Sequence, residues 1–132
     1  RIRSRRILVA CAPLRIVVAD ENKLYRMTLC SFLNKESNLQ VVAEAEDGLA
    51  AIQAVQKHNP NVVLLSISME VMNGLDAAWV IRSSFPDVRV ILLSMMEEEP
   101  PAETSRQAGA FCCLDKECTP NELIQAIRDA VN

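Results

Sequence analysis

Five polar residues follow short apolar runs and could together hold a cation or an oxyanion. Asp20 and Glu21 are adjacent carboxylates, which repel each other unless a divalent cation such as Mg²⁺ or a lysine lies close by. Ser94 could donate a hydrogen bond to an oxyanion, and Lys116 could neutralise one. Ser66 ends another apolar run, so it is either a reactive group or the mark of a missing one.

Each of these residues also has an ordinary structural explanation. Asp20 and Glu21 could cap a helix. Ser94 could simply end a strand, and Lys116 could be a solvated charge. The set at these spacings is harder to explain in that way than any single member. Because the carboxyl ends of parallel strands converge, we expect all these side chains to surround one crevice.

The elements that must position these residues alternate along the chain. Short apolar runs at residues 14–19, 40–45, 61–66, 88–94 and 110–114 alternate with amphipathic segments. This alternation predicts an α/β fold, a parallel sheet with helices on both faces. Tyr25, Leu29, Phe32 and Leu33 lie on one stripe of the first predicted helix.

Sequence signals also mark where three of the other helices begin, and two of these signals are capping residues. Asp47 can cap the second, which should end before Asn59 and Pro60, and a third begins near Gly74. Residues 119–122 (TPNE) form a capping box with proline at the first helical position of the last helix. Residues 97–108 offer few apolar positions and predict a loop or a short helix.

Composition limits the function. A chain of 132 residues is typical of one domain, and a net charge of −3 gives no reason to expect direct nucleic-acid binding by this segment. The five cysteines have no C-x-x-C spacing, which favours reduced thiols in a cytoplasmic protein. No apolar stretch is long enough to span a membrane. Residues 1–13 have a basic start and a short apolar core, and we interpret them as a leader or an added segment that precedes a domain at 14–132.

From residue 14 to residue 131 the sequence resembles the receiver domains of two-component response regulators, in particular those joined to LuxR/NarL-type DNA-binding domains. The resemblance rests on residues 18–21 (VADE), 62–66 (VVLLS), 72–75 (MNGL), 91–94 (ILLS), 109–110 (GA), 114–116 (LDK) and 119–123 (TPNEL). It implies a flavodoxin-like (βα)5 fold with a doubly wound five-stranded sheet in the order 2-1-3-4-5. It also implies Asp20 and Glu21 as the acidic pair that binds Mg²⁺, Ser94 as the conserved hydroxyl position and Lys116 as the lysine that neutralises phosphate.

The same resemblance places Ser66 at the phosphoacceptor position, where receivers have an aspartate. A serine hydroxyl is not an anionic nucleophile at neutral pH, and it removes one oxygen ligand of Mg²⁺. The turn at residues 69–74 (MEVMNG) lacks the proline and first glycine that are common there, and Cys113 replaces the usual switch aromatic. We therefore predict a pseudo-receiver with no enzymatic activity, weak or absent Mg²⁺ binding and no other cofactor. His58, the only histidine, should lie at the opposite end of the sheet from Ser66.

Such a domain would be a phosphorylation-independent signalling or interaction module, as the regulatory part of a transcriptional regulator. Two alternatives remain: a receiver phosphorylated on Ser66 by a Ser/Thr kinase, and an unrelated flavodoxin-like nucleotide-binding enzyme. The expected partners are a second copy, through the face of the last helix, and a histidine kinase or another protein. We expect no direct contact with nucleic acid or membrane.

One helix has an unusual apolar surface. Residues 77–81 (AAWVI) are apolar without interruption, with Leu75, Ala78 and Ile81 as the predicted core face. Trp79 and Val80 are then candidates for an exposed interaction patch. The simpler explanation, which the size of the side chain favours, is that Trp79 folds down over the edge of the core.

Overall fold

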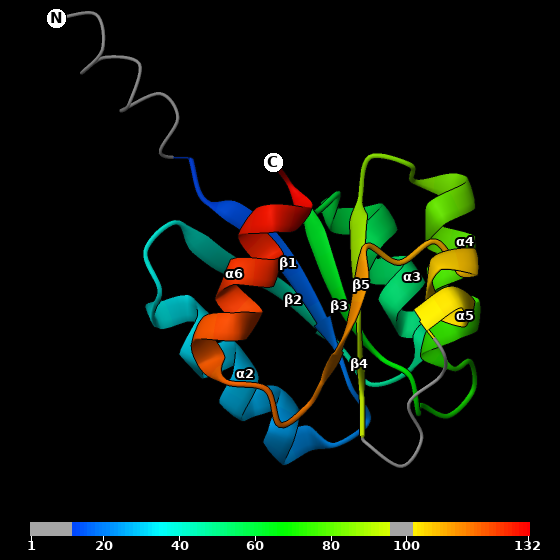
Figure 1. Cartoon of the computed structure of the whole chain (residues 1–132), viewed down its shortest axis with the longest axis horizontal. Coiled ribbons are helices and arrows are strands. Elements are labelled where there is room, and N and C mark those ends of the chain that lie inside the picture. The colour runs from blue at the N-terminus through cyan, green and yellow to red at the C-terminus, as the bar shows by residue number, and fades with distance from the viewer. Residues whose placement is uncertain (1–11, 96–101) are drawn as a thin grey trace, which may run out of the picture.

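The computed structural model describes residues 12–95 and 102–132, which form one parallel sheet with helices on both faces (Figure 1). The strands are β1 (Leu14–Ala19), β2 (Leu39–Ala45), β3 (Val62–Ser66), β4 (Arg89–Ser94) and β5 (Cys112–Asp115), in the order β2-β1-β3-β4-β5. The helices are α2 (Lys23–Lys35), α3 (Gly48–His58), α4 (Gly74–Ser84), α5 (Ala102–Gln107) and α6 (Pro120–Ala130). The predicted flavodoxin-like fold and its strand order are confirmed.

Two hydrophobic cores lie on opposite faces of the sheet because successive strand residues point to opposite sides. Val63 and Leu65 of β3 pack on the face covered by α3 and α4. Val62 and Leu64 pack on the other face, against α2 and α6. Figure 1 shows these helices on the two sides of the sheet, with α5 beside α4. All five residues of β3 are buried, as expected for a central strand of a parallel sheet.

Side-chain caps fix where the helices begin. Asp47 caps α3 by accepting a hydrogen bond from the Ala50 amide, and Asn59 ends this helix in the left-handed conformation. Thr119 and Glu122 form the predicted capping box at the start of α6. The cap of α2 is Asn22 rather than Asp20 or Glu21, so the explanation of the acidic pair as capping residues is wrong.

The structure confirms Ala78 and Ile81 as core residues of α4 and corrects the prediction for Trp79. The buried residues of this helix are Gly74, Ala77, Ala78 and Ile81, and Leu75 is only partly buried. Trp79 has 60% of its surface exposed, so it does not fold over the edge of the core as we expected. The weak helix is confirmed as a short one, α5, while residues 96–101 lie outside the described residues, as do residues 1–11 of the predicted leader.

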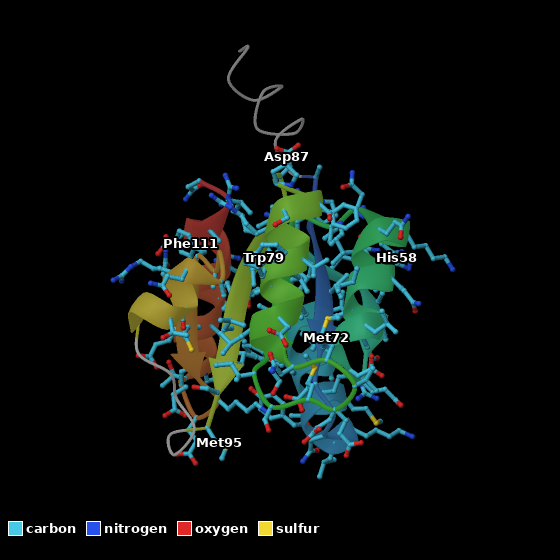
Figure 2. The ribbon with its side chains drawn as sticks, turned by 90° about the vertical axis from the view of Figure 1, so that its right-hand side faces the viewer. His58, Met72, Trp79, Asp87, Met95 and Phe111 are labelled. Atoms are coloured by element: carbon cyan, nitrogen blue, oxygen red, sulfur yellow. The ribbon has the colours of Figure 1, made fainter. Side chains whose placement is uncertain are left out.

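His58 lies at the end of the sheet where the strands begin. Its carbonyl accepts a hydrogen bond from Arg15, near the start of β1. Figure 2 shows His58 above Met72 and Met95, and Met95 directly follows the carboxyl end of β4. The prediction that this histidine is remote from Ser66 is confirmed. In the described part of the chain, no helix is long and apolar enough to cross a bilayer.

Candidate functional site

Asp20 and Lys116 meet at the carboxyl edge of the sheet. Asp20 follows β1 and is 1% exposed, and its Oδ1 accepts a hydrogen bond of 2.8 Å from the Asn22 amide. Its Oδ2 lies 2.7 Å from Nζ of Lys116. The angles of this contact fall short of a hydrogen bond, so Oδ2 has no hydrogen-bond donor among the described residues. At this distance the two opposite charges still form an ion pair, and the lysine neutralises the buried carboxylate.

Two further neighbours hold Lys116 in this position. Its backbone amide donates to the carbonyl of Ser94, and this hydrogen bond ties the chain after β5 to the end of β4. Its ammonium lies 5.0 Å from the ring centre of Tyr25 on α2, in the range of a cation–π contact. Burial, and then the charge of Asp20, raise the pKa of Tyr25 to about 12. The phenol therefore remains neutral near physiological pH.

Ser66 and Ser94 end adjacent strands, β3 and β4, and both are fully buried. The Ser66 hydroxyl donates only a long hydrogen bond, 3.5 Å, to the carbonyl of Ser68. The Ser94 hydroxyl accepts from the thiol of Cys113 on β5 at 3.8 Å. The structure therefore brings Asp20, Ser66, Ser94 and Lys116 to one edge, with Cys113 next to Ser94, as the sequence predicts.

Glu21 does not join this group. It is exposed, and together with Glu46, Asp47 and Glu70 it lines a neighbouring hollow of about 520 Å³. The two adjacent carboxylates therefore have different surroundings, one buried against Lys116 and one facing solvent. Among the described residues, no three His, Cys, Asp or Glu side chains converge closely enough to hold a metal ion.

Mg²⁺, which the resemblance implies for an active receiver, does not fit the donors at this edge. Oδ1 of Asp20 accepts from the Asn22 amide, and Oδ2, which has no hydrogen-bond donor among the described residues, faces the positive charge of Lys116. Ser66 offers a neutral hydroxyl in place of a carboxylate, whereas Mg²⁺ in proteins is usually bound through carboxylate oxygens. We therefore derive no chemical step through a metal.

Two features of the site were missed in the sequence. Tyr25 was assigned only to the core stripe of its helix, although its ring also covers the ammonium of Lys116. Val71 lies in the loop after β3 with a φ of 66°, a left-handed value that is a genuine outlier for a β-branched residue. The missing glycine of the 69–74 turn is the one sequence signal that pointed to this position.

Comparison with known proteins identifies the family. The family model "Response regulator receiver domain" matches residues 16–128, which is most of the chain. This chain belongs to the response regulator receiver family. The finding sets aside the alternative of an unrelated flavodoxin-like enzyme.

Individual relatives agree with this assignment. The receiver is 35% identical to the transcriptional regulatory protein DegU of Brevibacillus brevis over 115 residues, 87% of this chain and 49% of DegU. It also resembles the solved receiver domain of NarL from Mycobacterium tuberculosis, with a TM-score of 0.84, 33% identity, and coverage of 91% of this chain and 97% of that one. The receiver thus spans about half the length of the curated transcriptional regulators that it matches.

One relative is an enzyme. The protein-glutamate methylesterase/protein-glutamine glutaminase of Pyrococcus abyssi is 39% identical over 102 residues, 77% of this chain and 27% of that protein. Receivers of this kind are therefore found both in transcriptional regulators and in an enzyme. The expectation that our chain has no enzymatic activity stays a prediction.

Proposed function

We propose that this receiver is a pseudo-receiver, which signals through protein contacts without taking a phosphoryl group from phosphohistidine. The observation that carries the proposal is the pairing at the carboxyl edge, where Asp20 and Lys116 already neutralise each other. At the end of β3, which lies between β1 and β4, the position expected for a nucleophilic carboxylate is occupied by the buried hydroxyl of Ser66.

The chemistry of Ser66 supports the same conclusion. A serine becomes a nucleophile only when a neighbouring base removes its proton. The one hydrogen-bond acceptor that Ser66 contacts among the described residues is the carbonyl of Ser68, which cannot serve as such a base. His58 lies at the other end of the sheet. Asp20 is held by Lys116 and by the Asn22 amide, so its oxygens are not free for this role.

The wider role follows from the relatives. Because DegU and the Pseudomonas protegens response regulator GacA are about twice as long as the matched region, we propose that the receiver is the regulatory part of a transcriptional regulator. Its partners would be a histidine kinase or another signalling protein. A homodimer through the face of α6 is a further hypothesis, although the exposed residues of this helix, such as Gln125 and Asp129, are polar.

Intact-mass measurement tests the proposal. The wild-type receiver, incubated with acetyl phosphate and Mg²⁺, should gain no phosphate. Ser66→Asp supplies both the nucleophile and a metal ligand, so this variant should bind Mg²⁺ and gain phosphate slowly. Recovery should be partial because Glu70, Val71 and Cys113 still depart from the family pattern. Ser66→Asn is the matched control, since it has a similar size but no carboxylate.

Two results would contradict the proposal. A phosphate adduct on wild-type Ser66, located by peptide mapping, would show that the serine itself accepts phosphate. The same adduct formed only with a Ser/Thr kinase would support the alternative of a receiver that such a kinase phosphorylates on Ser66. That kinase would have to reach a side chain with no exposed surface. Calorimetric titration of the wild type checks the metal, because tight Mg²⁺ binding is not expected from these donors.

A further inference from the structure

The outer face of α4 carries a symmetric set of exposed residues. Trp79, the only tryptophan of the chain, is the sixth of the eleven residues of α4, with five residues on either side. It is 60% exposed, and Figure 2 shows it on the outer face of the helix. Asp76 precedes it by three positions and Arg82 follows it by three, and both are exposed. The helix therefore has an aromatic centre with an acid toward one end and a base toward the other.

These three residues form one ridge on the helix surface. Residues three apart are neighbours on a helix, about 4.5 Å apart along its axis. Rows of this kind are the ridges through which packed helices interdigitate. None of the ion pairs formed within residues 12–95 and 102–132 involves Asp76 or Arg82. Tryptophan is enriched among the residues that contribute most to the stability of protein interfaces, so this exposed side chain is a candidate centre of an interaction site.

We propose that a second copy of this chain docks on this face, with the two α4 helices crossing about a two-fold axis so that their ridges run antiparallel. An isologous interface requires a surface that is complementary to itself. Antiparallel pairing of the two ridges, centred on Trp79, places each tryptophan beside its symmetry mate. The same rotation places Asp76 of one copy near Arg82 of the other, and the reverse pair forms by symmetry.

The neighbouring helix has the same polarity. On α3, Asp47 lies at the amino end and Lys57 in the last turn. Leu49, in the first turn of α3, is 45% exposed and adds apolar surface next to the loop that leads into α4. Asp87, labelled beyond the carboxyl end of α4 in Figure 2, is a negative charge among the basic residues at that end of the two helices. The face is thus mainly acidic where the helices begin and mainly basic where they end.

This arrangement favours a second copy over an unrelated partner. A partner with its own sequence would need no symmetric spacing of charge about Trp79, whereas a two-fold interface does. The polar exposed face of α6 has no comparable aromatic centre. Because the contact involves mainly one helix from each copy, we expect a small interface and a weak, concentration-dependent dimer. The proposal does not depend on whether Ser66 accepts phosphate.

Sedimentation velocity and tryptophan fluorescence over a wide concentration range test the proposal on the same samples. The wild-type chain should dimerise, and its emission should shift to shorter wavelength as Trp79 leaves water. Trp79→Ala should abolish the dimer without changing the melting temperature. Asp76→Arg and Arg82→Glu should each weaken the dimer by about tenfold or more, because each places like charges opposite one another. The double charge swap should restore it.

Controls make the outcome decisive. Circular dichroism and melting curves identify any variant that fails to fold, which matters for Arg82 because its stem lies against Gly109. If Arg82→Glu unfolds, Asp76→Arg and Trp79→Ala still test the contact. A monomer at every concentration would overturn the proposal. So would a dimer that is unaffected by these variants but is lost when Gln125 and Asp129 on α6 are both replaced by arginine.

Discussion

Two loops border the same crevice but are held in different ways. The loop from β5 to α6 is fixed by local hydrogen bonds: Asp115 accepts from the Glu117 amide, and Thr119 and Glu122 close the capping box. The ion pair of Lys116 with Asp20 anchors the same segment to the end of β1. The loop from β3 to α4 instead contains a tight turn in which the Met72 amide donates to the carbonyl of Glu70, with Val71 in the left-handed region between them.

The difference shows which part of the site has stayed compatible with receiver chemistry. The lysine contacts Asp20, the ring of Tyr25 and the end of β4, so its charge already has partners within the described residues. The other half has a hydroxyl with one long hydrogen bond and a strained, 78% exposed valine. A three-residue turn with positive φ at its centre is rare and strained, and it is rarer still with a β-branched side chain.

The largest predicted effect is on the lysine side. Lys116→Ala should leave the buried carboxylate of Asp20 without its counter-charge and lower the free energy of unfolding by about 3 kcal/mol. Urea denaturation followed by circular dichroism measures this loss. The double variant Asp20→Asn/Lys116→Met is the matched control, and it should be more stable than Lys116→Ala because no unpaired charge is buried. Equal stability of Lys116→Ala and wild type would mean that the ion pair contributes nothing.

A smaller effect is expected where the β3 loop enters α4. A methyl group on Gly74 would overlap the carbonyl of Ser66, which is backbone and cannot easily move. Gly74→Ala should therefore destabilise the domain by about 2 kcal/mol through overpacking, although alanine is the better helix former. Ser84→Ala, at the other end of the same helix and exposed, is the control. If both variants melt at the wild-type temperature, the close approach of α4 to β3 is not a constraint.

The sequence allowed most of the fold to be predicted, for physical reasons that particular residues illustrate. The buried run 62–65 and the caps Asp47 and Thr119 are local signals, and each was assigned correctly. The choice of Asp20 rather than Glu21 as the partner of Lys116 is not local, because it depends on how β1 and β5 are placed in the sheet. The exposure of Trp79 was also misjudged: the helical periodicity placed it on the outer face of α4, but the general tendency of large aromatic residues to be buried favoured the opposite.

A third variant should stabilise the weaker loop. Glycine adopts positive φ without strain, so Val71→Gly relieves a cost of roughly 1–3 kcal/mol and adds about 0.5–1 kcal/mol of backbone entropy loss. We expect a net gain of about 1 kcal/mol in the free energy of unfolding, measured by urea denaturation. The free energy of unfolding of Val71→Ala should fall between those of the wild type and Val71→Gly, because alanine removes the β-branch but keeps a side chain. A loss of stability in Val71→Gly would show that the valine side chain has contacts that outweigh its strain.

The smallest predicted effect is a loss of folding stability at high pH, which arises from Tyr25 beside Lys116. Burial and the charge of Asp20 raise the pKa of Tyr25 from 10.0 to about 12, so the folded state holds the phenol proton more tightly than the unfolded state. This contribution to stability is fully present below about pH 10 and is lost as the pH rises toward 12. Tyr25 is the only tyrosine, so its tyrosinate absorbance reports this pKa directly. Tyr25→Phe should be as stable as the wild type at neutral pH and more stable than the wild type near pH 12. Val71→Gly should instead show the same gain in stability at neutral and at alkaline pH. A Tyr25 that titrates near 10 would show that its ring is not held against the buried ion pair.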